Sequence, residues 1–232
     1  MKEIVIIGAG GVGKEVLWII EQINNIKSTY RVLGFIDDDK LKKDKEFLGY
    51  KILGNLEYLK EIKYEGGVVV AIANYKVRKS IVEKLKGLKV NFPIIKHPNV
   101  KLHESVEIGE GTIIYEGVII SPNVKIGKQV IISPKCGIGH DSVIEDYVGL
   151  LWNVNISGND FIEEGVLFGS GSTIIQGKKV KKESIIGAGA VVTKDINETG
   201  IYKGIPAKEK NKFEEDKNGE KNTRDRRNFT SN

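Results

Sequence analysis

The sequence contains one cysteine, Cys136, and only three histidines among its 232 residues. A single cysteine excludes an intrachain disulfide framework and any metal site built only of cysteines. No apolar run comes near the length of about 20 residues that a helix needs to span a bilayer. The first residues also lack a basic stretch followed by an apolar core and a cleavage site, which are the features of a signal peptide. These absences predict a cytoplasmic protein without membrane insertion.

The chain also has only a small excess of charge of one sign. It contains 36 Lys and Arg residues and 31 Asp and Glu residues, which gives a formal net charge of +5. Acidic residues are interleaved with basic ones along the chain, so no dense basic stripe of the kind that binds nucleic acid is evident. A content of 40% hydrophobic and 29% charged residues suits a packed core and excludes global disorder. We therefore expect a folded protein that does not bind nucleic acid.

Residues 1–99 alternate between short β-branched runs and helical patterns. Glu3 to Ile7, Val32 to Ile36 and Val68 to Ile72 have the composition of buried strands. Val12 to Ile23 and Lys76 to Leu88 carry apolar residues at helical spacing. Strands that alternate with helices predict a parallel sheet of the α/β class. Because the segment is short, we expect a Rossmann-like half-domain and not a whole dinucleotide-binding fold.

From Val100 onward the sequence repeats with a period of six residues. When it is cut into hexapeptides from Val100 to Asp195, the third residue of every block is apolar, from Leu102 and Ile108 to Val192. Neither a helix, with a period of 3.6, nor a strand, with a period of 2, produces this pattern. Short strands joined by tight corners do, if three of them form each coil and the apolar residues stack into one core. The sequence therefore predicts a parallel β-helix after the half-domain.

The order of several segments makes the chain similar to one protein family. These segments are Gly8-Ala9-Gly10-Gly11, Phe35 to Asp39, Ile95 to Pro98, the hexapeptides, and Gly204-Ile205-Pro206-Ala207-Lys208. They resemble the bacterial hexapeptide-repeat sugar acetyltransferases, which include bacillosamine and perosamine N-acetyltransferases and enzymes that acetylate sialic acid. The resemblance covers residues 1–208 and implies that the β-helix is left-handed. It implies a sugar-nucleotide-binding domain at 1–99 and an acyltransferase domain with a coenzyme A segment at 100–208. The polar composition of residues 209–232 predicts a disordered tail.

The segment Gly8-Ala9-Gly10-Gly11-Val12-Gly13 lies between the first expected strand and the first expected helix. Glycines allow a tight turn there, and a helix N-terminus attracts anions, so the segment is a candidate phosphate cradle. A nicotinamide dinucleotide is one candidate ligand, but the second half of a dinucleotide fold is missing; a turn needed only for packing is another alternative. The resemblance implies that the nucleotide of a sugar substrate binds here, with contacts from Gly10, Gly11, Val12, Asp37, Asp38 and Ala73. Many family members have a histidine where this chain has Val12.

His140 stands out among the histidines, because it lies beside Asp141 at an expected corner in the middle of the β-helix. Transfer of acetyl from a thioester to a sugar amine or hydroxyl needs a base, and histidine titrates in a suitable range. A neighbouring carboxylate can orient the ring and raise its basicity. The resemblance implies that His140 and Asp141 form the catalytic dyad, whereas an ordinary surface corner is the alternative. Cys136 is expected to point into the core as a small hydrophobic residue, so we expect direct transfer.

The resemblance also implies that Gly149, Ser170 and Ala188 contact acetyl-CoA, the expected co-substrate, and no metal cofactor is expected. Two positions depart from the family pattern. A second histidine, often found nine residues after the catalytic one, is replaced by Gly149, and an asparagine seven residues before it is replaced by Ser133. These departures bear on the acceptor and on efficiency more than on the type of reaction.

One outward-facing column of the hexapeptides is aliphatic and uncharged. It consists of Ile113, Ile131, Gly149, Leu167 and Ile185. An apolar patch of this kind predicts burial against a partner, and closed cyclic symmetry is the usual result. The family implies a homotrimer of parallel prisms.

Together these features predict an acetyl-CoA-dependent N-acetyltransferase that acts on a nucleotide-linked amino sugar for surface polysaccharide or glycan synthesis. A sugar O-acetyltransferase of the sialic-acid type is the close alternative, because the sequence does not separate an amine acceptor from a hydroxyl. A γ-type carbonic anhydrase would need three histidines converging on zinc, and His140 is the only histidine after the first coil. A non-catalytic β-helix scaffold would leave the His140–Asp141 pair and the segment Gly204 to Lys208 unexplained.

Overall fold

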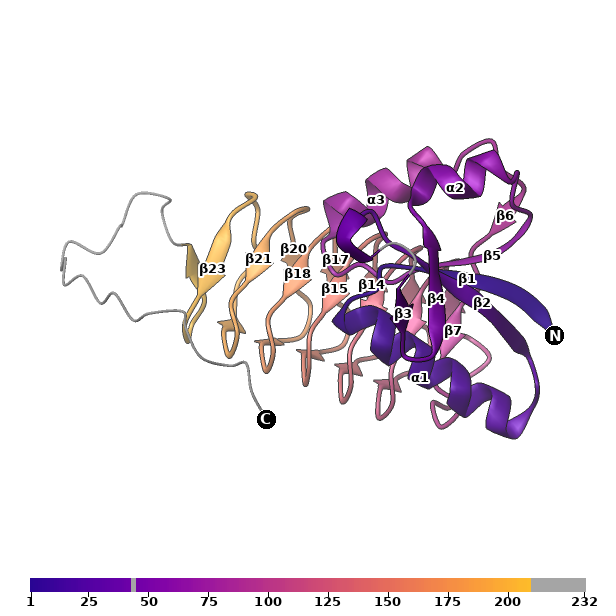
Figure 1. The fold of residues 1–232 in the computed structure, drawn as a ribbon. Coiled ribbons are helices and arrows are strands. Elements are labelled where there is room, and N and C mark those ends of the chain that lie inside the picture. Colours follow the sequence, from indigo (N-terminus) through magenta and orange to yellow (C-terminus); the bar gives the residue numbers. More distant parts are fainter. Residues whose placement is uncertain (43–44, 210–232) are drawn as a thin grey trace, which may run out of the picture.

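The N-terminal domain is a six-stranded sheet with helices on both sides. A computed structural model describes residues 1–42 and 45–209 of the chain (Figure 1). The strand order is β3-β4-β2-β1-β5-β6, and all neighbours run parallel except β3 and β4. In chain order the elements are β1 (Lys2–Ile7), α1 (Gly11–Ile26), β2 (Tyr30–Ile36), the 3-10 helix η1 (Lys40–Lys42), β3 (Glu46–Phe47), β4 (Tyr50–Gly54), α2 (Leu56–Glu61), β5 (Gly66–Val70), α3 (Tyr75–Lys84) and β6 (Val90–Asn91).

Alternate residues of β1 point to opposite faces of this sheet. Ile4 and Ile6 pack with α1 on one face, whereas Val5 packs with α2 and α3 on the other. Figure 1 shows α1 on one side of the sheet and α2 and α3 on the opposite side. The strands and the two helices expected from the sequence are present, although β5 ends at Val70 and not at Ile72, and α3 ends at Lys84. The helix stops there because the chain turns before Gly87, which adopts a φ of +97° that favours glycine.

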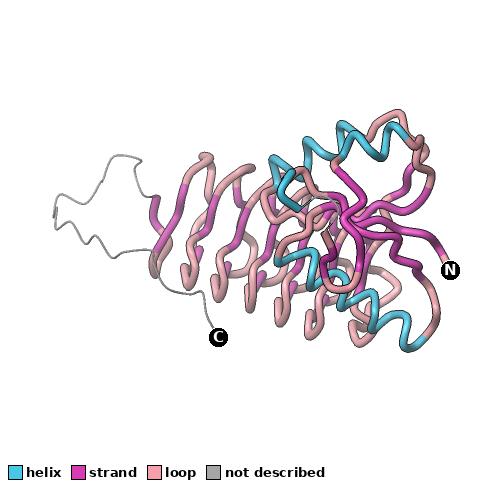
Figure 2. Tube along the Cα trace, viewed as in Figure 1, coloured by secondary structure: helices cyan, strands magenta, loops and turns pink. Residues whose placement is uncertain are grey.

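A parallel β-helix with three faces follows, and Figure 2 shows its short strands joined by corners. Face 1 contains β9 (Ile113–Ile114), β12 (Ile131–Ile132), β15 (Gly149–Leu150), β18 (Leu167–Phe168) and β21 (Ile185–Ile186). Face 2 contains β10 (Ile119–Ile120), β13 (Gly137–Ile138), β16 (Asn155–Ile156), β19 (Thr173–Ile174) and β22 (Val191–Val192). Face 3 contains β8 (Glu107–Ile108), β11 (Lys125–Ile126), β14 (Val143–Ile144), β17 (Phe161–Ile162) and β20 (Lys179–Val180).

The period of six residues produces this architecture as expected. Each strand pairs with the strand one coil later, so that Ile131 lies beside Gly149 and Gly149 beside Leu167. The apolar third residues of the hexapeptides stack into one continuous core. Gly139 shows why some corners need glycine, since a Cβ on this residue would lie 2.5 Å from the carbonyl carbon of Ser157 in the next coil. The prediction of a parallel β-helix is confirmed.

Face 1 joins the two domains. β7 (Ile95–Lys96) pairs with β9, and Ile113 and Ile131 on the outside of face 1 are buried in the same cluster as Ile4 of the N-terminal sheet. The prediction that a partner covers the whole aliphatic column is therefore wrong for Ile113 and Ile131, because the chain's own N-terminal domain covers these two residues. At the other end of the column, Ile185 is 41% exposed.

The far end of the β-helix is closed by β23 (Ile201–Lys203) and β24 (Lys208–Glu209), which pair antiparallel. Glu209, which the sequence analysis assigned to the tail, thus belongs to a strand and pairs with Tyr202. The remainder of the tail that we expected to be disordered, 210–232, lies outside the described residues. Across 1–42 and 45–209, no helix has the length and apolar character that a membrane crossing requires.

Asp160 is a carboxylate inside the β-helix, at an inward position that small or apolar residues fill in most other coils. It is 1% exposed. Its Oδ1 accepts a hydrogen bond from the amide of Lys178 at 2.7 Å, whereas its Oδ2 has no partner among the described residues. Burial raises the pKa of Asp160 to about 6, against the opposing effect of the Lys178 amide.

This raised pKa makes a pH-dependent contribution to stability. The folded state holds the proton of Asp160 more tightly than the unfolded chain does. The stability that this protonated carboxyl contributes is fully present below the unfolded pKa of about 3.9, and it is lost as pH rises through about 6. The unfolding free energy of Asp160→Asn minus that of the wild type should therefore increase by up to about 2 kcal/mol when the pH is raised from 4.5 to 8. Denaturant unfolding at both pH values checks this, and a difference that does not change with pH would contradict it.

Candidate active site

His140 lies at the corner between β13 on face 2 and β14 on face 3. Its Nδ1 is 2.7 Å from Oδ2 of Asp141. The two side chains are 55% and 46% exposed, so both are open to a ligand. With Nδ1 bonded to the carboxylate, Nε2 is the nitrogen left to accept a proton.

The neighbouring coils hold this pair in place. Asn123, one coil earlier, donates its Nδ2 to Oδ1 of Asp141 at 3.1 Å. The hydrogen bond from His140, followed by the one from Asn123, lowers the pKa of Asp141. One coil later the His140 ring lies against Gly158, where a Cβ would be 2.7 Å from Nε2. Asn123 and Gly158 are not among the site residues predicted from the sequence, although their places in the same corner of adjacent coils are a signal that points to both.

Cys136 lies in the core close to His140 in sequence but is not available for chemistry. It is 1% exposed, and its Sγ is 3.0 Å from the carbonyl oxygen of Leu151. Burial raises the pKa of the thiol to about 11. The expectation that Cys136 is a core residue is confirmed, and such a thiol is a poor nucleophile near neutral pH.

The glycine loop connects β1 to α1 at one edge of the N-terminal sheet. Packing requires two of its glycines, because a Cβ on Gly8 would lie 2.8 Å from the carbonyl oxygen of Ala71, and one on Gly13 would lie 2.1 Å from that of Gly8. Gly10 and Gly11 instead face open space, with nothing within 4 Å of such a Cβ. The first amides of α1 have no acceptor within the helix, so this open end fits an anion such as phosphate.

Asp37, at the end of β2, ties this loop down. Its Oδ2 accepts hydrogen bonds from the amide of Ala9 at 2.8 Å and from Nζ of Lys42 at 3.0 Å, and its Oδ1 accepts one from the amide of Asp39 at 3.0 Å. Partial burial alone would raise the pKa of Asp37, but these bonds outweigh burial and hold the pKa below its usual value. Asp37 therefore shapes the glycine loop directly, a role that the sequence analysis did not assign to it.

Several cavities border this edge of the sheet, and two of them reach the loop after β5. The first has a volume of about 160 Å³ and is lined by Asp37 and Asp38 together with Ile7, Gly8, Ile36, Leu56, Ile72, Val77 and Ile81. The second has a volume of about 270 Å³ and lies between the loop after β5 and face 1. Ala73, Tyr75, Tyr147, Gly149 and Leu167 are among its lining residues. The structure thus brings together Ala73 and Gly149, which the sequence analysis assigned to different ligands.

Ser170 and Ala188 are exposed on successive coils, at the corner between face 1 and face 2. The carbonyl oxygen of Ser170 accepts a hydrogen bond from the amide of Gly189 at 2.9 Å, which stacks the two corners. Trp152 occupies the same corner one coil earlier and is 50% exposed. This corner therefore offers a ligand two small residues and an aromatic side chain.

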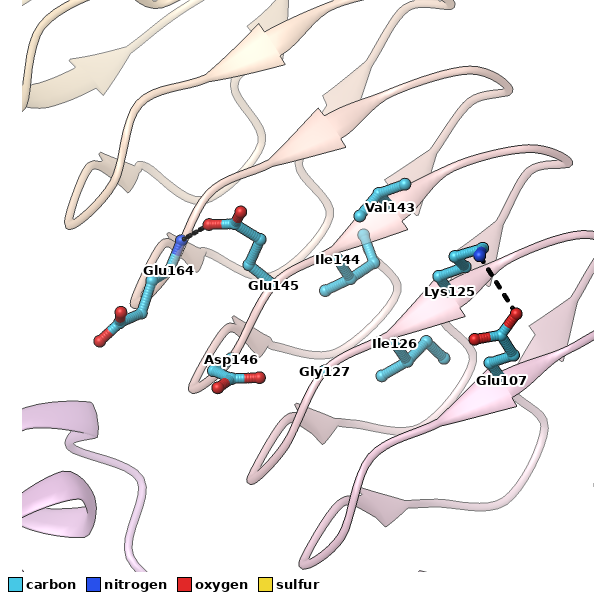
Figure 3. Close-up of a pocket in the computed structure, with 9 residues that line it drawn as sticks. All are labelled: Glu107, Lys125, Ile126, Gly127, Val143, Ile144, Glu145, Asp146 and Glu164. Carbon is cyan, nitrogen blue, oxygen red and sulfur yellow. Dashed lines mark hydrogen bonds and ion pairs between the residues drawn. The ribbon is translucent and has the colours of Figure 1, made fainter. Parts of the chain in front are cut away.

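Figure 3 shows an open groove of about 410 Å³ along face 3. Lys125 in this groove pairs with Glu107 at 3.1 Å, and Glu145 accepts the amide of Glu164 at 2.9 Å. Neither histidine nor cysteine is among the described residues that line it. The described ranges also hold no group of three His, Cys, Asp or Glu side chains placed to bind a metal ion. The His140 corner is therefore the better candidate for chemistry.

Within one chain, His140 does not meet the glycine loop. The N-terminal domain packs on face 1. His140 lies at the corner between faces 2 and 3, which is opposite face 1 in a three-sided prism. The candidate base and the candidate phosphate cradle are therefore on different sides of the molecule.

Comparison with known proteins agrees with this architecture. Residues 3–85 match the PglD N-terminal domain. The chain is 33% identical over 185 residues to GDP-perosamine N-acetyltransferase of Escherichia coli O157:H7. The matched region covers 79% of this chain and 82% of that protein. The chain belongs to the hexapeptide-repeat sugar acetyltransferases.

Solved structures extend the similarity of this acetyltransferase to both domains. A mutant of perosamine N-acetyltransferase from Caulobacter crescentus, in complex with CoA and GDP-perosamine, is 26% identical with a TM-score of 0.83, over 91% of this chain and 98% of that chain. The acetyltransferase domain of PglB from Neisseria gonorrhoeae, in complex with acetyl coenzyme A, is 25% identical with a TM-score of 0.81, over 90% and 98%. The family that the sequence resembles is therefore confirmed, whereas the individual site residues stay predictions.

Proposed function

We propose that this acetyltransferase moves an acetyl group from acetyl-CoA directly to the amine of a nucleotide-linked amino sugar, with His140 as general base. The observation that carries the proposal is the exposed His140–Asp141 pair, with Nδ1 and Oδ2 2.7 Å apart. Relatives named as N-acetyltransferases, one of them bound to CoA and GDP-perosamine, favour an amine acceptor over the hydroxyl of the sialic-acid alternative. Because acetyl-CoA is a cytoplasmic metabolite, the proposed activity implies a cytoplasmic location.

The chemistry requires only one base. The amine nitrogen attacks the thioester carbonyl, a C–N bond forms, and the C–S bond breaks to release CoA. Nε2 of His140 takes the proton that the amine loses, and Asp141 holds the opposite side of the ring and stabilises its positive charge. The proton can then pass to the sulfur of the leaving thiolate. Cys136 takes no part.

Ligand placement follows from the two domains. The open loop at Gly10, Gly11 and Val12 would hold the phosphates, and Asp37 and Asp38 border the cavity beside it. Ala73 lies between this cavity and face 1, where the acceptor sugar would reach Gly149. Ser170 and Ala188 would contact acetyl-CoA along the exposed corner of the β-helix.

We also infer a homotrimer, because one chain separates the parts of the site. The glycine loop and Gly149 are on the side of face 1, whereas His140 is at the opposite corner. A second copy could pack its His140 corner against the part of face 1 that contains Gly149, Leu167 and Ile185. This packing would bring the base to the acceptor, and three copies would close the ring.

An assay of thiol release tests the proposed function. The protein is incubated with acetyl-CoA and, separately, with GDP- and UDP-linked amino sugars, the matching sugars without the amine, and free sialic acid. We expect CoA release only with a nucleotide-linked amino sugar. Release with sialic acid and not with amino sugars would establish the O-acetyltransferase instead.

Asp37→Ala should weaken binding of the nucleotide sugar by about tenfold and leave acetyl-CoA affinity unchanged, because the amide of Ala9 and Lys42 lose their shared acceptor and the loop loosens. Calorimetric titration with GDP and UDP measures the effect. Asp39→Ala is the matched control, since its Oδ1 accepts the amide of Leu41 at 3.0 Å and not that of Ala9 in the glycine loop. Tight binding of NADH by the wild type would instead support a dinucleotide site.

Mixing two impaired variants tests the trimer. His140→Ala supplies an intact nucleotide loop and Asp37→Ala supplies an intact base. If the site forms between copies, subunit exchange should restore activity at low substrate concentration. A mixture that exchanges subunits and is no more active than the separate variants, or a monomer in sedimentation analysis, would contradict the inferred assembly.

A further inference from the structure

Arg78 is a buried cation at the junction of the two domains. It lies on α3 and is 1% exposed. On the β-helix side, its Nε donates to the carbonyl oxygen of Gln129 at 2.9 Å and a terminal nitrogen donates to that of Tyr147 at 2.8 Å. On the other side, its second terminal nitrogen donates to the carbonyl oxygens of Ile72 at 2.6 Å and Ala73 at 3.0 Å.

All of these acceptors are backbone carbonyls, which distinguishes Arg78 from an ordinary ion pair. No ion pair of Arg78 occurs within the described ranges, and its guanidinium carbon lies 6.0 Å from the centroid of the Tyr147 ring. Burial lowers the pKa of Arg78 to about 10, so the guanidinium stays charged at neutral pH. The planar fork of the arginine, with its five N–H donors, reaches four acceptors in two domains at once.

Two of the four bonded carbonyls, those of Ile72 and Ala73, belong to the segment that links the two cavities. Ile72 lines the cavity beside Asp38, and Ala73 lines the cavity beside Gly149. Tyr147, whose carbonyl oxygen Arg78 also binds, lines the second cavity from the β-helix side. A shift of Arg78 would therefore move one wall of each cavity relative to face 1.

We propose that Arg78 is a positioning residue that sets the loop Ile72–Ala73 against the β-helix, and so fixes where the nucleotide-linked acceptor lies relative to Gly149. This inference rests on the proposed function. Arg78 does not touch the reacting atoms, and its effect passes through the backbone of the loop.

Lys79 offers a matched control on the same helix. It also bridges the domains, through an ion pair with Glu164 and a contact of its Nζ with the Tyr147 ring at 5.8 Å, but it holds no part of the loop. If any link between the domains sufficed, loss of Lys79 and loss of Arg78 would have similar kinetic effects. If the loop position matters, only Arg78 should affect the acceptor.

The test compares Arg78→Lys with Lys79→Met below the unfolding temperature of each. We expect Arg78→Lys to raise KM for the nucleotide-linked amino sugar by about tenfold or more and to leave KM for acetyl-CoA within about twofold. Lys79→Met should leave both constants within about twofold. Amide hydrogen exchange at residues 72–75 should be faster in Arg78→Lys than in Lys79→Met.

Arg78→Gln, which removes the buried charge and keeps a donor, replaces Arg78→Lys if that variant does not fold. A folded Arg78 variant with lower thermal stability but unchanged kinetic constants would overturn the inference and leave Arg78 a purely structural residue. Failure of the proposed function would look different, because the wild type itself would then release no CoA with any amino sugar.

Discussion

Replacing His140 with alanine is expected to lower kcat by about 10²–10⁴-fold, the usual contribution of a positioned general base. KM for both substrates should change little, because the ring acts on the proton of the amine and the binding residues lie elsewhere. The ring is exposed at a corner, so the substitution removes no core packing. Steady-state kinetics with acetyl-CoA and a nucleotide-linked amino sugar measure the loss.

Asp141→Asn provides the graded comparison. It should cost less than His140→Ala, because it removes orientation and basicity but leaves the imidazole. Unfolding midpoints of both variants should stay near that of the wild type, which separates a catalytic loss from a folding defect. Full activity in His140→Ala would remove this residue from the mechanism.

Gly158→Ala is expected to lower kcat by up to about 10²-fold without a comparable loss of stability. The new methyl group would lie 2.7 Å from Nε2 of His140, so the ring must move away from its position beside Asp141. The crowded group is the end of a flexible side chain, and hence the coil itself need not shift. Kinetics together with thermal unfolding measure the two effects separately.

Gly137→Ala is the matched control for this substitution. Gly137 is on β13, close to His140 in the same coil, but a Cβ there would meet only Oδ1 of Asn155 at an ordinary 3.4 Å. It should therefore keep kcat near that of the wild type. Equal activity losses in the two variants would show that Gly158 does not act through the His140 ring.

The repeat explains why most of the fold could be predicted from the sequence. An apolar residue at every sixth position, from Leu102 to Val192, admits few structures other than stacked coils. The same register placed Cys136 in the core and His140 at a corner, and the structure shows both. Local patterns of this kind report which way a side chain points.

Contacts between distant segments could not be predicted in this way. The aliphatic column of face 1 indicated that something covers it, but its pattern does not distinguish a partner from the chain's own N-terminal domain, which buries Ile131. Arg78 follows a valine in a lysine-rich helix and has the sequence context of a solvent-facing residue. Its burial depends on carbonyl oxygens 51 and 69 residues away.

Identification of the product tests the central claim most directly. The wild-type protein is incubated with acetyl-CoA and GDP-perosamine or a UDP-linked amino sugar. The product is analysed by mass spectrometry before and after treatment with hydroxylamine, and the protein is analysed without that treatment. We predict that the sugar nucleotide gains one acetyl group that resists hydroxylamine, as an amide does, while the protein remains unmodified. An acetyl group removed by hydroxylamine, or one found on the protein at Cys136, would contradict direct transfer to an amine.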